Sequence, residues 1–329
     1  MRRGRSGRVG LAGCLVLVAA CTAVPAAAQQ PPLAGARVDH VGLVVKDIDQ
    51  SARRYAAVLG VPVPAVSTTS VPLPGGRTVR VRIAQFPLPN FRIDLAQPLD
   101  ADGVFEPFLK AWGDGIQHLG VTVPDRFPER VAELVARGGR LTMGGPSASF
   151  AFVEMTDQLG TTLELKPAGP AGAAPATAAG ALGSSVVSHV GLILKDVQKT
   201  ARLFAELTGA PAPQFIVAKG VDFPPSFTGD RSHEVTITMA KLGDISLELQ
   251  QDPGTAKGKN PWHDSAVRLG GNGVEHVAFT VVGDLDAMRR HLAAQGAPEV
   301  LGGPGSRYPH FEFGPTLGMM IELLGTPAK

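Results

Sequence analysis

The sequence predicts an α+β protein built from four βαβββ modules in two tandem halves. Two observations support this prediction. The phrase VDHVGLVVKD at 38–47 returns as VSHVGLILKD at 187–196, and the segments that begin with these phrases are identical at about half of their positions. Within each half, a shorter phrase again places histidine third in an apolar run, as IQHLGVTV at 116–123 and VEHVAFTV at 274–281. Repetition at this level indicates duplicated structural units.

A helix is expected after each phrase. Following the first phrase, Ile48, Ala52, Tyr55 and Leu59 recur at helical spacing, and Asp47 stands where a capping residue is expected. The segment after the third phrase repeats this pattern. Further helical patterns follow the second and fourth phrases, at 126–139 and 284–297.

Strands are expected after each helix, because apolar and polar residues alternate there. In NFRIDLAQ, for example, Phe91, Ile93 and Leu95 should face the helix, which leaves Arg92 and Asp94 on the other face. The polar faces are expected to line a wet concavity. The strand-like runs are 78–86 and 90–98, 150–156 and 161–167, 233–242 and 244–251, and 308–313 and 318–324.

Residues 1–28 have the features of a secretory signal peptide. The basic stretch MRRGRSGR precedes the apolar run VGLAGCLVLVAA and the small residues AVPAAA, with cleavage expected after Ala28. Two alternatives remain open. VAAC, ending at Cys21, resembles a bacterial lipobox, and the same segment can be interpreted as a single N-terminal anchor helix. A periplasmic or secreted protein, or else a membrane-tethered lipoprotein, is therefore expected.

Composition narrows the classes of function. Hydrophobic residues make up 44% of the chain and charged residues 18%, as in folded globular proteins. The expected signal peptide holds four of the 31 basic residues and no acidic one, so 27 basic residues remain against 29 acidic residues. This balance argues against nucleic acid as a partner. Both cysteines, Cys14 and Cys21, lie in the same segment, so no disulfide is expected in the processed chain.

The segment 168–185 is interpreted as a linker, because it is rich in Ala, Gly and Pro and has no hydrophobic period. It separates an expected first domain at 36–167 from a second domain at 186–326, each made of two modules. The sequence leaves open which modules pair. Each half can form its own concave cup, or the first module can pair with the fourth and the second with the third.

The order of these phrases resembles the vicinal oxygen chelate superfamily, which includes glyoxalase I, methylmalonyl-CoA epimerase, extradiol dioxygenases and bleomycin- or fosfomycin-resistance proteins. The resemblance covers nearly all of the chain that follows the expected signal peptide. It rests on four openings like HVGLVVKD and on closing strands like IELL. It is strongest to the glyoxalase I and methylmalonyl-CoA epimerase branch, through FRIDLAQP followed by GDGIQHLGVTVPD, and ISLELQQ followed by GNGVEHVAFTV. The fold it implies is two tandem domains, each with two modules curved into a cup.

The resemblance also implies metal sites, because a histidine from each first strand and a carboxylate from each last strand meet at one metal in this superfamily. Two imidazoles and two carboxylates suit a divalent Zn, Ni, Co, Mn or Fe ion, and the residues do not distinguish among these. Asp94 departs from the pattern, because its side chain is one methylene shorter than glutamate. The matching positions are His40, Asp94, His118 and Glu164 in the first half, and His189, Glu248, His276 and Glu322 in the second.

The chemistry that this resemblance implies is proton abstraction next to a carbonyl, with Glu322 and Glu164 as catalytic bases and a metal that stabilises the resulting enediolate. An exported lyase, isomerase or epimerase acting on a small oxygen-chelating substrate is therefore expected, as a monomer or homodimer. A non-catalytic small-molecule binding protein of the resistance type is an alternative. An extradiol-type dioxygenase fits less well, because it requires no carboxylate at Glu248. His310 and the other remaining histidines are interpreted as flanking strands or lying at the surface.

Three arginines in the first module are expected to bind an anionic substrate. In TVRVRIAQF, the apolar residues are assigned to the helix side, which places Arg80 and Arg82 in the cup. Arg92 shares the face of Asp94. Three guanidinium groups on one concave wall suit a carboxylate or phosphate. The alternative is that these arginines pair with nearby acids or reach solvent at the rim.

Overall fold

A computed structural model of the chain describes residues 30–169, 180–218, 225, 229–232, 234–257 and 260–325. The expected signal peptide at 1–28, with Cys21, lies outside these residues, as does the stretch 170–179 of the expected linker. The helices among the described residues include none that is long and apolar enough to cross a lipid bilayer.

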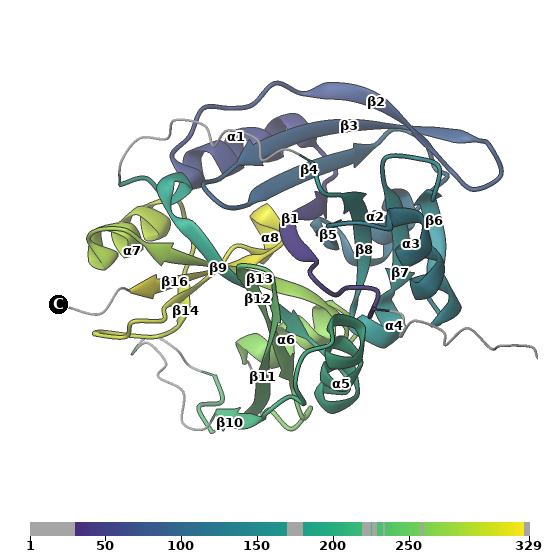
Figure 1. Ribbon diagram of the computed structural model, residues 1–329. Helices are drawn as coiled ribbons and strands as arrows, with labels where there is room; N and C mark the ends of the chain where they lie inside the picture. Colours follow the sequence, from purple (N-terminus) through teal and green to yellow (C-terminus); the bar gives the residue numbers. More distant parts are fainter. Residues whose placement is uncertain are drawn as a thin grey trace, which may run out of the picture. The chain divides into compact units, whose positions relative to one another are not determined.

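The first half forms one eight-stranded sheet, shown in purple to teal in Figure 1. Its strand order is β2-β3-β4-β1-β5-β8-β7-β6. The elements in chain order are β1 Arg37–Val44, α1 Ile48–Leu59, β2 Ser67–Pro72, β3 Thr78–Pro87, β4 Arg92–Pro98, α2 Phe105–Trp112, β5 Gly115–Val123, α3 Phe127–Ala136, β6 Arg140–Gly144, β7 Ala151–Met155, α4 Thr156–Leu159 and β8 Thr161–Pro167.

The second half repeats this arrangement in a second eight-stranded sheet, with the order β10-β11-β12-β9-β13-β16-β15-β14. A 3₁₀ turn, η1 Leu182–Ser184, precedes it. Its elements are β9 Val186–Ile193, α5 Val197–Thr208, β10 Ile216–Ala218, β11 Val235–Leu242, β12 Ile245–Gln251, α6 Pro261–Arg268, β13 Gly273–Val281, α7 Leu285–Ala294, β14 Glu299–Leu301, β15 His310–Glu312, α8 Gly314–Leu317 and β16 Met320–Gly325.

These two sheets confirm the predicted α+β fold of tandem βαβββ modules, and they answer the question of pairing. The first and second modules share one sheet through β1 and β5, and the third and fourth share the other through β9 and β13. Each half therefore carries its own concave face. The helices α2 and α6, which the repeats did not predict, lie between the two modules of each half.

The register of the four central strands brings the predicted ligand positions together. In the second half, Gly191 of β9 is opposite both Glu248 of β12 and His276 of β13, and Ala278 of β13 is opposite both His189 and Glu322. Since paired residues in adjacent strands point to the same face of a sheet, all four side chains project from one face. The first half has the equivalent register for His40, Asp94, His118 and Glu164.

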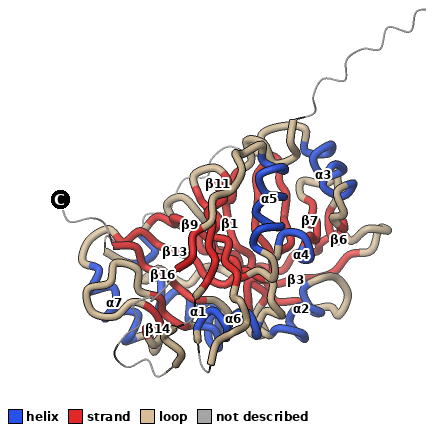
Figure 2. Tube along the Cα trace, turned by 90° about the horizontal axis from the view of Figure 1, so that it is seen from below, coloured by secondary structure: helices blue, strands red, loops and turns tan. Residues whose placement is uncertain are grey.

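The opposite faces of the sheets carry helices α1, α3, α5 and α7 and the main core. Helix α1 begins as predicted, because the Asp47 side chain accepts a hydrogen bond from the Gln50 N–H, and it ends at Gly60, whose φ of 68° suits glycine. Its apolar face, with Ile48 and Tyr55, is buried in a core that includes residues of both halves. The Tyr55 hydroxyl donates to the carbonyl oxygen of Leu317, 2.6 Å away in the second half. Figure 2 shows the strands in the interior with helices at their margins.

Candidate metal centre

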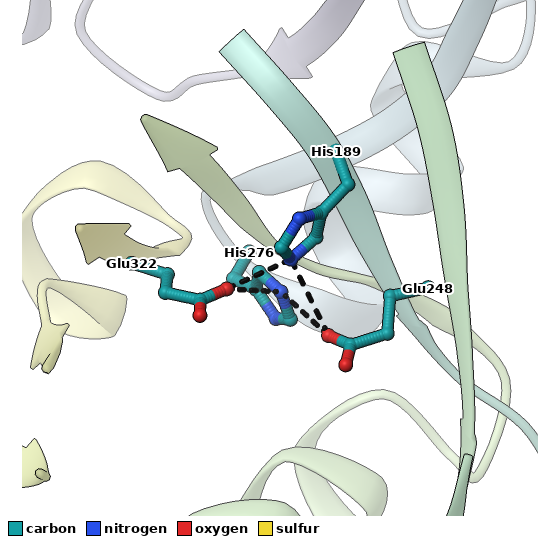
Figure 3. A group of neighbouring side chains, drawn as sticks. All are labelled: His189, Glu248, His276 and Glu322. Carbon is teal, nitrogen blue, oxygen red and sulfur yellow. Dashed lines mark ion pairs between the residues drawn. The ribbon is translucent and has the colours of Figure 1, made fainter. Parts of the chain in front are cut away.

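Four side chains of the second half converge on one point of the concave face (Figure 3). His189 and His276 project from the adjacent strands β9 and β13, and Glu248 and Glu322 project from the flanking strands β12 and β16. Nε2 of His189 lies 2.8 Å from Oε2 of Glu322 and 3.4 Å from Oε2 of Glu248. Nε2 of His276 lies 3.2 Å from Oε2 of Glu248 and 3.5 Å from that of Glu322. One ligand atom from each residue lies within 4.8 Å of the other three.

Three of the four converging atoms lack hydrogen-bond partners, and the fourth, Oε2 of Glu248, accepts from the side chain of Gln250 at 2.8 Å. Nε2 of His189, Nε2 of His276 and Oε2 of Glu322 are buried, and none has a partner of acceptable geometry among the described residues. Buried polar atoms are rarely left in this state, because the loss of hydration is costly. Two imidazole nitrogens and two carboxylates aimed at a common point match the donors that divalent transition metals prefer. The residues present therefore fit a metal ion.

Electrostatics favour ionised carboxylates at this point. Burial works to raise the pKa of Glu248, but the imidazoles of His189 and His276 lower it to about 2. The pKa of Glu322 is also held below its usual range, because His310, His189 and His276 outweigh the effect of burial. Burial works to lower the pKa of His276, yet the surrounding carboxylates raise it well above the usual value. A metal ion would replace the protons that these imidazoles otherwise hold.

Two residues outside the set of four complete the surroundings. The buried Glu275 places Oε2 3.4 Å from Nδ1 of His276, as partners of metal-binding histidines often do. His310, on β15, places Nε2 3.7 Å from Oε2 of Glu322 and its ring 5.4 Å from that of His276. The interpretation of His310 as a strand-flanking histidine missed this contact. The signal that could have identified His310 is its register opposite Glu322. This register is known only once β15 is seen to pair with β16.

The first half brings together three of its four predicted ligands. His40, His118 and Glu164 form a buried cluster, with Nε2 of His40 2.7 Å and Nε2 of His118 3.4 Å from Oε2 of Glu164. Asp94 stays outside this cluster, with Oδ2 3.9 Å from Nε2 of His40. Its shorter carboxylate is held by Arg92, whose Nε donates to Oδ1 at 2.6 Å. Asp94, the residue that departs from the glutamate pattern, is therefore also the one whose carboxylate does not reach the cluster.

His40 and Glu164 of the first cluster are already bonded, in contrast to His189, His276 and Glu322 of the second half. Both ring nitrogens of His40 contact carboxylate oxygens at 2.7 Å, Asp39 on one side and Glu164 on the other. The remaining oxygen of Glu164 forms an ion pair with Nζ of Lys166 at 3.0 Å. The second half has Leu324 where the first has Lys166, and Ser246 where it has Arg92.

The prediction that Arg80 and Arg82 line the cup is wrong. Arg82 pairs with Asp49 at the start of α1, and Arg80 pairs with Asp100, so both lie on the helix side of β3. The apolar residues that alternate with them, Val81 and Ile83, face the concavity instead. Alternation was assigned to the wrong faces because the concave wall of this strand is itself apolar. Arg92 does lie on the concave face, in its hydrogen bond to Asp94.

The family model described as "Glyoxalase/Bleomycin resistance protein/Dioxygenase superfamily" matches the chain twice, at residues 39–153 and 188–310. The chain belongs to this superfamily. Each match begins in the first central strand of one sheet and includes both histidines of its central strands, but it ends before β8 or β16, the strands of Glu164 and Glu322. Among curated proteins, no sequence matches the chain significantly.

Three solved structures are similar to this chain to different degrees. A variant of 4-hydroxymandelate synthase from Streptomyces coelicolor has a TM-score of 0.61 and 16% identity, covering 89% of this chain and 93% of that one. A fusion of a xylose isomerase-like TIM barrel with 4-hydroxyphenylpyruvate dioxygenase has a TM-score of 0.49 and 14% identity, covering 91% and 50%. Methylmalonyl-CoA epimerase from Mycobacterium tuberculosis has a TM-score of 0.30 and 28% identity, covering 41% and 89%. The first similarity establishes shared architecture over both halves.

Proposed function

We propose that the chain is a metal-dependent enzyme of the glyoxalase and epimerase type, with its metal held by His189, Glu248, His276 and Glu322. The observation that supports this most strongly is the convergence of two imidazoles and two carboxylates, in which the buried converging atoms of His189, His276 and Glu322 have no hydrogen-bond partners of their own. The proposed substrate is a small molecule with neighbouring oxygens. The proposed reaction is proton transfer at the carbon next to a carbonyl, as in a lyase, isomerase or epimerase.

A divalent metal at these four residues supplies a Lewis acid that stabilises the negative charge formed next to a carbonyl. In this proposal Glu322 carries the proton, because it is buried within β16 with His310 beside it. His189 and His276 hold their ring planes nearly perpendicular, at 83°, and their Nε2 atoms would bind the ion. Glu164, the second predicted base, is less suited to the role, because both of its oxygens are already bonded.

The number of carboxylates favours proton transfer over a dioxygenase reaction. Non-haem iron oxygenases use two histidines and one carboxylate, which leaves positions open for oxygen and substrate. Here Glu248 adds a second carboxylate, within 3.4 Å of both histidine nitrogens. A dioxygenase and a non-catalytic binding protein remain the two competing functions, and the experiment below separates them.

The test measures exchange of a carbon-bound proton with solvent. Purified protein, stripped of metal and then reconstituted, is incubated in D₂O with small α-hydroxy ketones and thiohemiacetals, and deuterium incorporation is followed by NMR. Exchange that requires metal and is lost in Glu322→Gln is the expected result. Oxygen consumption that survives Glu248→Gln would indicate a dioxygenase instead. Metal and ligand binding without exchange would indicate a binding protein.

Export is a separate part of the proposal, and it rests on the sequence of residues 1–28 alone. Expression in a bacterial host followed by N-terminal sequencing of the product tests it. The expected mature product begins at Gln29, or at a lipid-modified Cys21 if the lipobox is used. Recovery of intact chains that begin at Met1 from the cytoplasm would contradict export.

A further inference from the structure

The concave face of the first half encloses a cavity that the metal centre of the second half does not use. Its volume is about 190 Å³, and its floor is formed by His118, Glu164 and Asp94. An apolar cavity of roughly 150 Å³ accommodates a benzene molecule. The cavity therefore has room for one six-membered ring with a small substituent.

The walls of this cavity are aromatic and aliphatic. Phe105 and Phe152 meet edge to face with ring centroids 5.9 Å apart, and Phe150 meets Phe152 in the same way at 6.0 Å. Ile83 and Met143 add aliphatic surface. Edge-to-face surroundings of this kind suit a further aromatic ring.

This wall distinguishes the two halves of the chain. Phe152 of β7 is opposite Glu164, and the equivalent residue of the second half, His310, is opposite Glu322. The ring of Phe152 packs on that of His118, with centroids 4.7 Å apart. An apolar ring thus covers the first cluster at the position where the second has an imidazole.

The floor of the cavity offers hydrogen-bond acceptors. Oε1 of Gln117 accepts from Nδ1 of His118 at 2.9 Å, and Nε2 of the same ring lies 3.4 Å from Oε2 of Glu164. The carboxylates of Glu164 and Asp94 are acceptors. The two cations nearest to them are already engaged, Lys166 with Glu164 and Arg92 with Asp94. A ligand with a hydroxyl group suits this floor better than a ligand with a carboxylate.

We propose that the first half binds a monocyclic phenol in this cavity without a metal ion. The ring lies among Phe105, Phe150 and Phe152, and its single O–H donates to the carboxylate of Glu164, which has about four lone-pair sites and can accept a further hydrogen bond. Metal is not required, because both nitrogens of His40 and both oxygens of Glu164 are already bonded within the protein. This inference concerns a different site from the proposed function, so either can fail without the other.

The test is calorimetric titration of the whole protein, after metal removal, with phenol, toluene and benzoate. Phenol should bind at least about tenfold more tightly than either of the others, since a hydrogen bond to a charged group in a buried site is worth at least that factor. The His189→Ala/His276→Ala variant should bind phenol as the unaltered protein does.

Two variants locate the binding. Ile83→Trp fills the cavity and should abolish binding, whereas Thr68→Trp, at an exposed position of β2 that does not line it, should leave binding unchanged. Both residues lie toward the surface, so folding is expected to survive, and circular dichroism checks this. Equal affinity for toluene, tighter binding of benzoate, a requirement for metal, no binding of phenol, or binding that survives Ile83→Trp would each overturn the proposal.

Discussion

A side chain on Gly191 would collide with the ring of His276, because a Cβ atom at Gly191 would lie 1.9 Å from Cε1 of the imidazole. The first half has the same relationship twice. A Cβ at Gly42 would lie 1.8 Å from His118, and one at Gly120 would lie 1.8 Å from His40. Each of these glycines lies two residues after the histidine of its own strand and leaves room for the histidine of the neighbouring strand, whereas the fourth phrase has Ala278 at this position, opposite His189. This explains why the phrase His-Val-Gly or His-Leu-Gly recurs along the chain.

Gly191→Ala should displace the ring of His276. The proportional loss of bound metal should be larger than the proportional loss in the free energy of unfolding. Overpacking of this kind costs about 1–3 kcal/mol, and the displaced ring can no longer share a point with His189. Metal analysis beside denaturant unfolding measures both effects. Gly169→Ala, where a Cβ would meet nothing within 4 Å, is the control. A Gly191→Ala protein with full metal content would show that the close approach of strand and ring is not needed.

Tyr55→Phe should destabilise the protein, because it leaves the buried carbonyl of Leu317 without its donor. The expected loss is about 1–3 kcal/mol at pH 7, measured by urea unfolding. The control Tyr308→Phe removes an exposed phenol and should change the free energy of unfolding by less than about 0.5 kcal/mol. Equal losses in the two variants would refute the role of the Tyr55 hydrogen bond.

The same residue predicts a pH dependence. Burial raises the pKa of the Tyr55 phenol well above its usual value. Above pH 10 the unfolded chain therefore loses a proton that the folded chain keeps, and this residue's contribution to stability falls as pH rises, by up to about 1.4 kcal/mol per pH unit. The stability difference between wild type and Tyr55→Phe should be constant below pH 9 and shrink above pH 10. A difference that stays constant up to pH 11 would argue against a buried, neutral phenol.

His310→Phe tests the residue that the repeats did not reveal. His310 approaches Glu322 but lies outside the group of four ligands, so metal content should be retained. Proton exchange with solvent should fall by about 10- to 100-fold, the range for residues that support metal ligands. His310→Gln, which keeps hydrogen-bonding capacity, should lose less. Loss of metal in His310→Phe would make His310 a ligand itself, contrary to this account.

The sequence was sufficient for the fold because its repeats recur in a fixed order. Each phrase marks a central strand, and the helix after each phrase has its own periodicity, as Ile48 and Tyr55 illustrate. Helices α2 and α6 were missed because they lie between modules and have no counterpart in the repeated phrases. The faces of β3 were assigned wrongly because alternation shows that two faces differ, but not which of them covers the core. An apolar cavity wall and an apolar core face give the same pattern.

The candidate site was predictable only in part, for a related reason. The histidines and acids of the second half could be proposed from their places in repeated phrases, and the structure brings all four together. His310 could not, because its role depends on its register opposite Glu322. In the first half, the shorter Asp94 signalled a difference between the sites. The ion pair between Glu164 and Lys166 depends on three-dimensional geometry that cannot be deduced from the sequence.

Metal content of the purified protein tests the central claim most directly. After reconstitution with Zn, Ni, Co, Mn or Fe and removal of free ions, elemental analysis should find about one ion per chain, as expected if only the second half has free ligands. The His40→Ala/His118→Ala variant should keep this ion, and the His189→Ala/His276→Ala variant should lose it, with circular dichroism confirming that both are folded. The account would be contradicted if the His189→Ala/His276→Ala variant kept its metal ion and the His40→Ala/His118→Ala variant lost it.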